Sequence, residues 1–306
     1  MAFTTKATIA TFGGKLLKLS HKSATTGTDM NVNVFFPGPV ADAESAAKKA
    51  PILYYLSGLT CSPDNCSEKG FLHATAARHG IAVVYPDTSP RGLNLPQEHD
   101  SWDFGEAASF YLDAAEATPY ATNYRMETYI TQELPALLLA AFPKQLDGDR
   151  QSITGHSMGG HGALTLYLKH PGQYKSVSAF APIANPTRCP WGQKAFKGYL
   201  GPADLDISPE SASDSTIPAS WKAHDATELI KSWNKTDDLK MLVDVGTGDN
   251  FYKNKQLLPE NLEAAIKEAG LKGATVRYQQ DYDHSYYFIS TFGQDHVDHA
   301  AKYLLA

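Results

Sequence analysis

The sequence has few cysteines, and their spacing excludes two classes of small, cross-linked protein. Only three of the 306 residues are cysteine, at positions 61, 66 and 189, so they cannot all pair, and no two of them form C-x-x-C. A disulfide framework and a zinc ribbon are therefore not expected. Free thiols persist in reducing compartments, which favours the cytoplasm as the location.

Strong basic clusters and long apolar runs are also absent from the sequence. The 33 acidic residues outnumber the 27 basic ones, the net charge is −6, and the longest basic run is Lys48–Lys49. This distribution argues against nucleic acid or an anionic membrane as the main partner. No apolar run reaches the roughly 18 residues that a membrane-spanning helix needs. Residues 1–21 alternate Thr and Lys with apolar residues, which predicts a pair of edge strands rather than a signal peptide.

What the sequence does contain is a regular alternation of short apolar runs with longer helix-like stretches. Seven strands are predicted: Met30–Phe36, Ile52–Leu56, Ile81–Tyr85, Ser152–Thr154, Val177–Phe180, Met241–Val245 and Thr275–Gln279. Five helices are predicted: Ser67–His79, Met126–Phe142, Met158–His170, Lys255–Ala269 and Tyr286–Leu304. This alternation indicates one α/β domain, residues 1–306, in which a mostly parallel sheet is flanked by helices on both faces. Residues 37–50 and 203–220 are predicted to be solvated surface insertions.

The segment ITGHSMGGHGALTLYLKH, residues 153–170, places a serine where a predicted strand turns into a helix. Serine is a favoured N-cap, and most serines at such a position only satisfy a backbone N–H. Capping does not require Gly155 and Gly159, however, and these two glycines complete the motif G-x-S-x-G around Ser157. The motif is typical of a nucleophile elbow, a turn so tight that side chains at both glycine positions would collide with neighbouring backbone.

Two further polar residues follow predicted strands. Asp249 comes after Met241–Val245 on a glycine-rich turn, and His284 comes after Thr275–Gln279. Catalytic groups gather at the carboxyl ends of parallel strands, and the chain order Ser, Asp, His is that of the α/β-hydrolase triad. We therefore predict Ser157 as the nucleophile, His284 as the base and Asp249 as the carboxylate that orients the imidazole.

Other residues compete for two of these roles. Asp244 lies inside its predicted strand, where its side chain would point along the sheet face, and Asp87 precedes the serine, which breaks the usual order. Asp249 therefore ranks first among the three carboxylates. His284 is one of 11 histidines, so a capping or surface role is the alternative for it.

A serine hydrolase also needs two backbone N–H donors aimed at the negative charge that develops on the acyl oxygen. Met158, the residue after the nucleophile, is predicted to supply one donor, aided by the positive end of its helix. Leu59, in the turn Ser57–Thr60 after a predicted strand, is predicted to supply the second. The alternative for this turn is an ordinary strand-to-helix connection.

No cofactor and no metal are expected. Gly246 and Gly248 resemble the start of a dinucleotide fingerprint, but Phe251 stands where the third glycine would be. The last helix has a row of acids and histidines with metal-like spacing, which is more typical of a solvated face. That row consists of Asp295, His296, Asp298 and His299. The aromatic residues of the same helix are predicted to bury it against the sheet, and they are Tyr286, Tyr287, Phe288 and Phe292.

Four longer segments are more specific than the triad itself. They are Leu56–Gly92, residues 155–164, Ala179–Gly201 and Asp283–Phe292. Together they resemble the esterase D family of S-formylglutathione hydrolases, and the similarity extends from about Leu53 to the end of the chain. The resemblance implies an α/β-hydrolase fold and a cytosolic serine hydrolase, usually dimeric. Its substrate would be the glutathione thioester S-formylglutathione, split into formate and glutathione, with side activity on small esters.

The resemblance also implies roles for individual residues. It places the catalytic roles on the same Ser, Asp and His as the spacing argument. It implies that Cys61 lies near the active site and that Trp191, Gln193 and Lys194 border the substrate pocket. The alternatives are a buried, inert thiol and a Trp that only packs. Both predicted insertions look longer than in the family, which bears on oligomer contacts and the pocket rim more than on chemistry.

Two other functions stay open on the residues alone. A broad carboxylesterase would use the same triad, because nothing in the residue pattern separates a thioester from a small oxyester. A non-catalytic hydrolase-fold protein that binds a ligand is the second alternative, and the complete Ser, Asp and His set argues against it.

Overall fold

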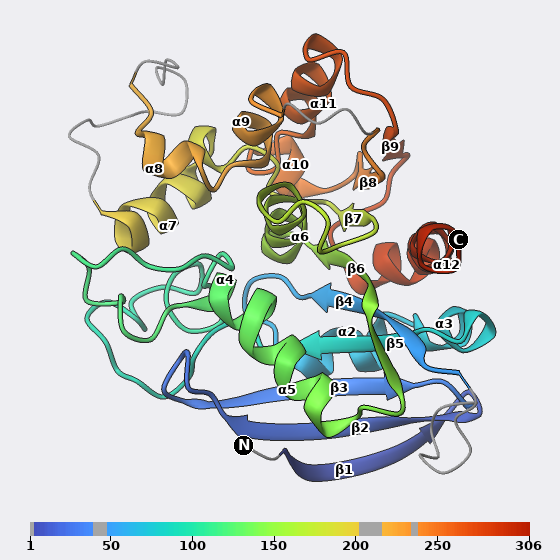
Figure 1. Ribbon diagram of the computed structural model, residues 1–306. Helices are drawn as coiled ribbons and strands as arrows, with labels where there is room; N and C mark the ends of the chain where they lie inside the picture. The colour runs from blue at the N-terminus through green and yellow to red at the C-terminus, as the bar shows by residue number, and fades with distance from the viewer. Residues whose placement is uncertain (1–2, 39–47, 202–215, 234–237) are drawn as a thin grey trace.

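The computed structural model describes residues 3–38, 48–201, 216–233 and 238–306, which are organised around one nine-stranded sheet (Figure 1). The strand order is β1-β2-β3-β5-β4-β6-β7-β8-β9. The pairs from β1 to β5 are antiparallel, and every pair from β5 to β9 is parallel. The mostly parallel sheet confirms the predicted α/β class.

All seven predicted strands are present, and the predicted amino-terminal strand pair is also found. The strands are Thr4–Thr11 (β1), Gly14–Lys22 (β2), Asp29–Phe36 (β3), Ala50–Leu56 (β4), Ala82–Pro86 (β5), Leu146–His156 (β6), Val177–Phe180 (β7), Met241–Gly246 (β8) and Ala274–Gln279 (β9). β4, β5, β7 and β8 are buried along their whole length. Strands with covered faces need no polar alternation, which explains their apolar sequences.

Helices cover both faces of the sheet. They are Pro63–Lys69 (α2), His73–His79 (α3), Met126–Thr128 (α4), Leu134–Ala141 (α5), Met158–Lys169 (α6), Pro190–Leu200 (α7), Ala219–Lys222 (α8), Ala226–Lys231 (α9), Asn250–Lys253 (α10), Pro259–Glu268 (α11) and Tyr286–Leu304 (α12). Figure 1 shows α3 and α12 on one side of the sheet and α5 and α6 on the other. Among the described residues, no helix is both long and apolar enough to cross a membrane.

The structure corrects several predicted helices. The helix predicted at Ser67–His79 is two helices, because the chain leaves α2 at Gly70 and starts again at His73. The helix predicted at Lys255–Ala269 begins only at Pro259, a residue suited to a first helical turn. Four helices, α7, α8, α9 and α10, were not predicted from the sequence. Ala50, predicted as the end of the first solvated insertion, is instead the buried first residue of β4, and residues 219 and 220 of the second predicted insertion belong to α8. Most of both predicted insertions lies outside the described residues.

Two predictions for α12 are wrong. His296 does not lie on a solvated face: it is fully buried, stacks on Phe180 with ring centroids 3.5 Å apart, and contacts Asp244 at 3.0 Å. Tyr287 does not help to bury the helix, since it is 84% exposed, whereas Phe288 is fully buried. The four residues with metal-like spacing each contact a different partner. The described residues contain no group of three or more His, Cys, Asp or Glu side chains able to hold a metal ion.

The parallel arrangement brings the ends of three strands to one edge of the sheet. Ser157 directly follows β6, Asp249 follows β8, and His284 follows β9. β6, β7, β8 and β9 are successive neighbours in the sheet. Residues far apart in the sequence therefore meet at this edge.

Candidate active site

The turn around Ser157 has the strained geometry of a nucleophile elbow. Ser157 has φ 59° and ψ −119°, a conformation that L residues rarely adopt. A Cβ atom at Gly155 would lie 2.2 Å from the carbonyl oxygen of Gly159, and one at Gly159 would lie 2.0 Å from that of Leu56. Both positions therefore exclude any side chain, and this is the physical reason for the two glycines of G-x-S-x-G.

The Asp249 carboxylate holds His284 at the same edge. Nδ1 of His284 lies 2.6 Å from Oδ2 of Asp249, and the other carboxylate oxygen accepts a hydrogen bond from the N–H of Phe251 at 2.7 Å. The Asp249 side chain is fully buried, so solvent does not compete for either contact. The arrangement directs Nδ1 of the imidazole toward the carboxylate and leaves Nε2 for a proton transfer.

The two competing aspartates have other partners. Asp244 forms ion pairs and hydrogen bonds with Arg277 and contacts Nε2 of His296. Burial by itself would raise the pKa of Asp244, but these partners outweigh it and lower the pKa to about 2. Asp87 is held by Arg91 at 2.8 Å. Neither carboxylate contacts His284, whereas Asp249 does.

Ser157 and His284 line one cavity of about 220 Å³. Its remaining lining comes from the loop after β4, from aromatic side chains and from His156. Those residues are Gly58, Leu59, Thr60, Cys61, Trp102, His156, Trp191, Phe251 and Tyr286. A serine hydroxyl and an imidazole that line the same mostly apolar cavity are what acyl transfer requires.

His156 is a site residue that the sequence analysis missed. Its ring packs on the ring of His284 with centroids 4.3 Å apart, and its Nε2 is buried with no hydrogen-bond partner among the described residues. Burial, reinforced by the neighbouring His284, holds the pKa of His156 well below its usual value. The imidazole beside His284 is therefore neutral. Its position inside G-x-S-x-G was the available sequence signal.

The two predicted oxyanion donors lie beside Ser157. Met158 is the first residue of α6, so its N–H has no acceptor inside the helix. Leu59 lines the cavity, and its loop is held against the elbow, because a Cβ at Gly58 would lie only 3.1 Å from the Cβ of Ser157. The positions of Leu59 and Met158 are compatible with the predicted role, and both residues remain predicted oxyanion donors.

The four residues that the resemblance placed near the substrate are not all in this cavity. Cys61 and Trp191 line it. Gln193 points elsewhere and donates to the carbonyl oxygen of Thr187 at 2.8 Å. Lys194 lines a separate cavity and contacts Ser101 at 2.7 Å. Gln193 and Lys194 follow Trp191 on α7, and the helical turn carries their side chains away from the triad.

Comparison with known proteins agrees with this class of site. The model of the Esterase family matches residues 23–299, and the fold is that of the α/β hydrolases. A solved S-formylglutathione hydrolase from Agrobacterium tumefaciens superimposes with a TM-score of 0.86 at 41% sequence identity. The match covers 99% of this chain and 100% of that one. The chain is therefore an esterase-family hydrolase.

Curated relatives narrow the family further. The chain is 49% identical to the S-formylglutathione hydrolase of Rattus norvegicus, over 96% of each chain. It is 46% identical to that of Arabidopsis thaliana, over 96% of this chain and 95% of the relative. The chain belongs to the S-formylglutathione hydrolase family.

Proposed function

We propose that this protein hydrolyses S-formylglutathione to formate and glutathione, with Ser157, His284 and Asp249 as its catalytic residues. The observation that supports this most is the 2.6 Å contact between His284 and Asp249 at the edge of the cavity that holds Ser157. Relatives that share 43–49% of the sequence have this activity in their names. Formate release from this thioester would place the protein in the disposal of formaldehyde.

The first half of the reaction forms an acyl-enzyme. Oγ of Ser157 attacks the formyl carbon while Nε2 of His284 takes the hydroxyl proton. The carbon–sulfur bond then breaks, the sulfur leaves with the bonding electrons, and the imidazolium gives up its proton to form glutathione. A thiol with a pKa near 8.5 leaves readily as an anion, so activation of Ser157 contributes more than protonation of the leaving group.

The second half returns the enzyme to its starting state. Water gives a proton to His284 and attacks the formyl ester, the bond to Ser157 breaks, and formate leaves as Ser157 regains its proton. The N–H groups of Leu59 and Met158 would stabilise the negative oxygen in both halves, each donor contributing roughly 3 kcal/mol. Asp249 stays ionised and keeps the imidazole oriented throughout.

Substrate preference tests the proposal against a broad carboxylesterase. We expect kcat/KM for S-formylglutathione to exceed that for a short aryl ester by at least about 100-fold, since contacts along glutathione add to those at the acyl group. Both substrates would be measured on the same preparation. Equal efficiencies would favour the carboxylesterase, and hydrolysis of neither substrate by folded protein would favour a ligand-binding role.

We further propose a cytoplasmic homodimer. The family resemblance is the source of both statements. The cytoplasmic location is also supported by the three thiols, Cys61, Cys66 and Cys189, which are all free and buried. Light scattering on the purified protein should give twice the chain mass, and a single chain mass at micromolar concentration would contradict the dimer.

A further inference from the structure

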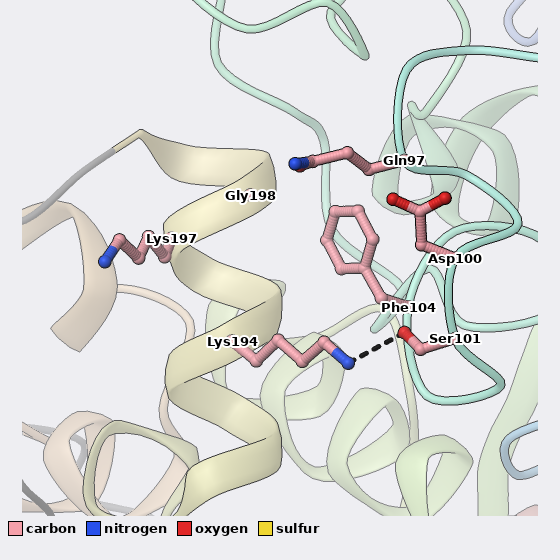
Figure 2. A pocket seen from close by; sticks show the side chains of 7 residues that line it. All are labelled: Gln97, Asp100, Ser101, Phe104, Lys194, Lys197 and Gly198. Atoms are coloured by element: carbon pink, nitrogen blue, oxygen red, sulfur yellow. Dashed lines mark hydrogen bonds between the residues drawn. The ribbon is translucent and has the colours of Figure 1, made fainter.

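A second cavity, of about 470 Å³ (Figure 2), lies beside the reaction cavity, which is the one that Ser157 and His284 line. The two cavities share both of their walls. On α7, Trp191 lines the reaction cavity and Lys194 lines the second one. On the facing loop, Trp102 lines the reaction cavity, and Ser101, one residue earlier, lines the second. The two cavities therefore lie one after the other between α7 and residues 97–104, and the space between these two walls is called the cleft.

Side-chain contacts join the two walls at the boundary. The indole rings of Trp102 and Trp191 meet edge to face with centroids 5.5 Å apart. Lys194 crosses the cleft to Oγ of Ser101 at 2.7 Å and to Oδ1 of Asp103 at 2.5 Å. These contacts fix the distance between α7 and the loop and leave the second cavity open beyond them.

The reaction cavity is too small for a whole glutathione thioester. Its volume of about 220 Å³ falls below the range of roughly 300–1,000 Å³ that small-molecule sites occupy. The formyl group and its sulfur must lie at Ser157, so the peptide part of the substrate has to extend along the cleft. The neighbouring cavity falls inside that range.

The residues that line the second cavity include two cations, Lys194 and Lys197, and one anion, Asp100. Two of the three N–H donors of Lys194 bind Ser101 and Asp103, and a third remains. The Asp100 carboxylate lines the cavity and has no ion pair with the described residues. Figure 2 shows the Gln97 side chain reaching over the cavity toward α7 and the ammonium of Lys197 pointing away from it.

The floor between these polar groups is apolar and rigid. Phe104 is buried and stacks on Tyr199 with ring centroids 4.7 Å apart. Its ring lies so close to α7 that a Cβ at Gly198 would be 2.3 Å from it. The absence of a side chain at Gly198 lets the ring pack against the helix, which gives a flat surface for a short methylene chain.

We infer that this second cavity binds the γ-glutamyl end of the glutathione group, with Lys194 on its α-carboxylate and Asp100 on its α-ammonium. The inference rests on the proposed function. Of the two ends of glutathione, only the γ-glutamyl end carries both charges on one carbon, and only that end has methylenes to cover Phe104. The glycyl end has a carboxylate alone and would leave Asp100 without a partner.

The length of the substrate agrees with the spacing along α7. Seven bonds separate the sulfur from the γ-glutamyl α-carbon, so the extended chain spans about 9 Å. Along the axis of α7, Lys194 lies about 4.5 Å from Trp191, and Gly198 lies about 10.5 Å from Trp191. The extended chain is thus about as long as the stretch of α7 that runs from the one cavity to the other.

Charge-removing variants test the inference. We expect Lys194→Met and Asp100→Asn each to raise KM for S-formylglutathione by about tenfold, because each loses one charge-assisted hydrogen bond to the substrate. kcat should stay within twofold, and kcat/KM for a short aryl ester should not change. Lys267→Met is the control, since it removes the same charge from an exposed position on α11 that lines neither cavity, and its KM should equal that of the wild type.

Truncated substrates separate the two ends of glutathione. S-formyl-γ-glutamylcysteine should keep a KM near that of S-formylglutathione. For S-formyl-N-acetylcysteinylglycine, which lacks both charged groups, KM should rise by about 100-fold, and Lys194→Met should add little to that rise, because the group it binds is already missing. The reverse ranking of the two truncated substrates would overturn the inference.

The outcomes distinguish the inference from the function on which it rests. A wild type that favours the aryl ester over S-formylglutathione overturns both. A wild type that prefers S-formylglutathione, with both variants unchanged or with the aryl ester affected equally, overturns the γ-glutamyl site alone.

Discussion

Asp244 and Asp249 lie five residues apart, and each contacts a different histidine. Asp249 contacts His284 at 2.6 Å at the edge of the reaction cavity, whereas Asp244 contacts His296 at 3.0 Å inside the fold. Both carboxylates are fully buried. Their environments differ because Asp244 also binds the guanidinium of Arg277. We propose that the first pair serves catalysis and the second serves stability.

This difference predicts opposite results for the same substitution. Asp249→Asn should lower kcat by about 10⁴-fold with little change in Tm, since the amide favours the wrong imidazole tautomer. Asp244→Asn should leave kcat per folded molecule nearly intact and lower the free energy of unfolding by about 3 kcal/mol, because it leaves a buried ion pair broken. Calorimetry and turnover on both variants check this, and a large kcat loss in Asp244→Asn with normal stability would reverse the assignment.

The glycine after the nucleophile gives a second prediction. A Cβ at Gly159 would lie 2.0 Å from the carbonyl oxygen of Leu56, so Gly159→Ala should distort the elbow and reduce activity by at least about 100-fold. Gly172→Ala is the control, because Gly172, unlike Gly159, has a positive φ and no atom within 4 Å of its Cβ position. The control should lose only about 1 kcal/mol of stability and keep its activity. Equal activity in both variants would show that the elbow tolerates a side chain.

A buried histidine away from the site predicts part of the pH dependence of stability. His73 stacks on Phe35 with centroids 4.4 Å apart, its Nε2 has no partner among the described residues, and burial lowers its pKa to about 4. The folded pKa lies below the usual 6.5, so the unfolded state binds the proton first as the pH falls. This contribution to stability is complete above about pH 6.5 and is lost as the pH falls toward 4.

Replacing that histidine should remove this part of the acid sensitivity. His73→Phe keeps the ring stacking and removes the titrating group, so the loss of unfolding free energy between pH 7.5 and pH 5 should shrink by about 2 kcal/mol. Urea unfolding of wild type and variant at both pH values measures the difference. An unchanged loss would show that His73 does not titrate in this way.

Cys61 offers a chemical probe of access to the reaction cavity. Its thiol lies 3.9 Å from the hydroxyl of Tyr286, and both residues line the cavity. Burial raises the pKa of Cys61, so a maleimide should react slowly at pH 7 and faster as the pH rises. A bulky adduct should abolish turnover by filling the cavity, and Cys61→Ala should resist the reagent. Full activity after stoichiometric modification would show that the substrate does not pass this side chain.

The sequence predicts features that depend on local backbone geometry better than those that depend on distant partners. The elbow at Ser157 could be found because two clashes require glycine on either side of it. The strands could be found because buried strands are uniformly apolar. The burial of His296 could not be found, because its reason is Asp244, 52 residues earlier in the chain.

The second cavity shows the same limit. Its loop, residues 97–104, has no regular secondary structure, and side chains distant in sequence hold it in place. Tyr124 contacts Glu98 at 2.5 Å, and Tyr199 accepts a hydrogen bond from the N–H of Gly105 at 2.8 Å. Only the family resemblance predicted that Lys194 borders the substrate pocket. The facing loop with Asp100 could be recognised only from the three-dimensional structure.

Covalent labelling of Ser157 tests the central claim most directly. A fluorophosphonate probe, followed by peptide mass spectrometry, should give one adduct per chain at Ser157, and Ser157→Ala should take up none while its turnover falls by at least about 10⁴-fold. Ser290→Ala, at a partly exposed serine of α12, should label and turn over like the wild type. Folded wild-type protein that stays unlabelled, or a Ser157→Ala variant that loses only about tenfold in turnover, would contradict the account.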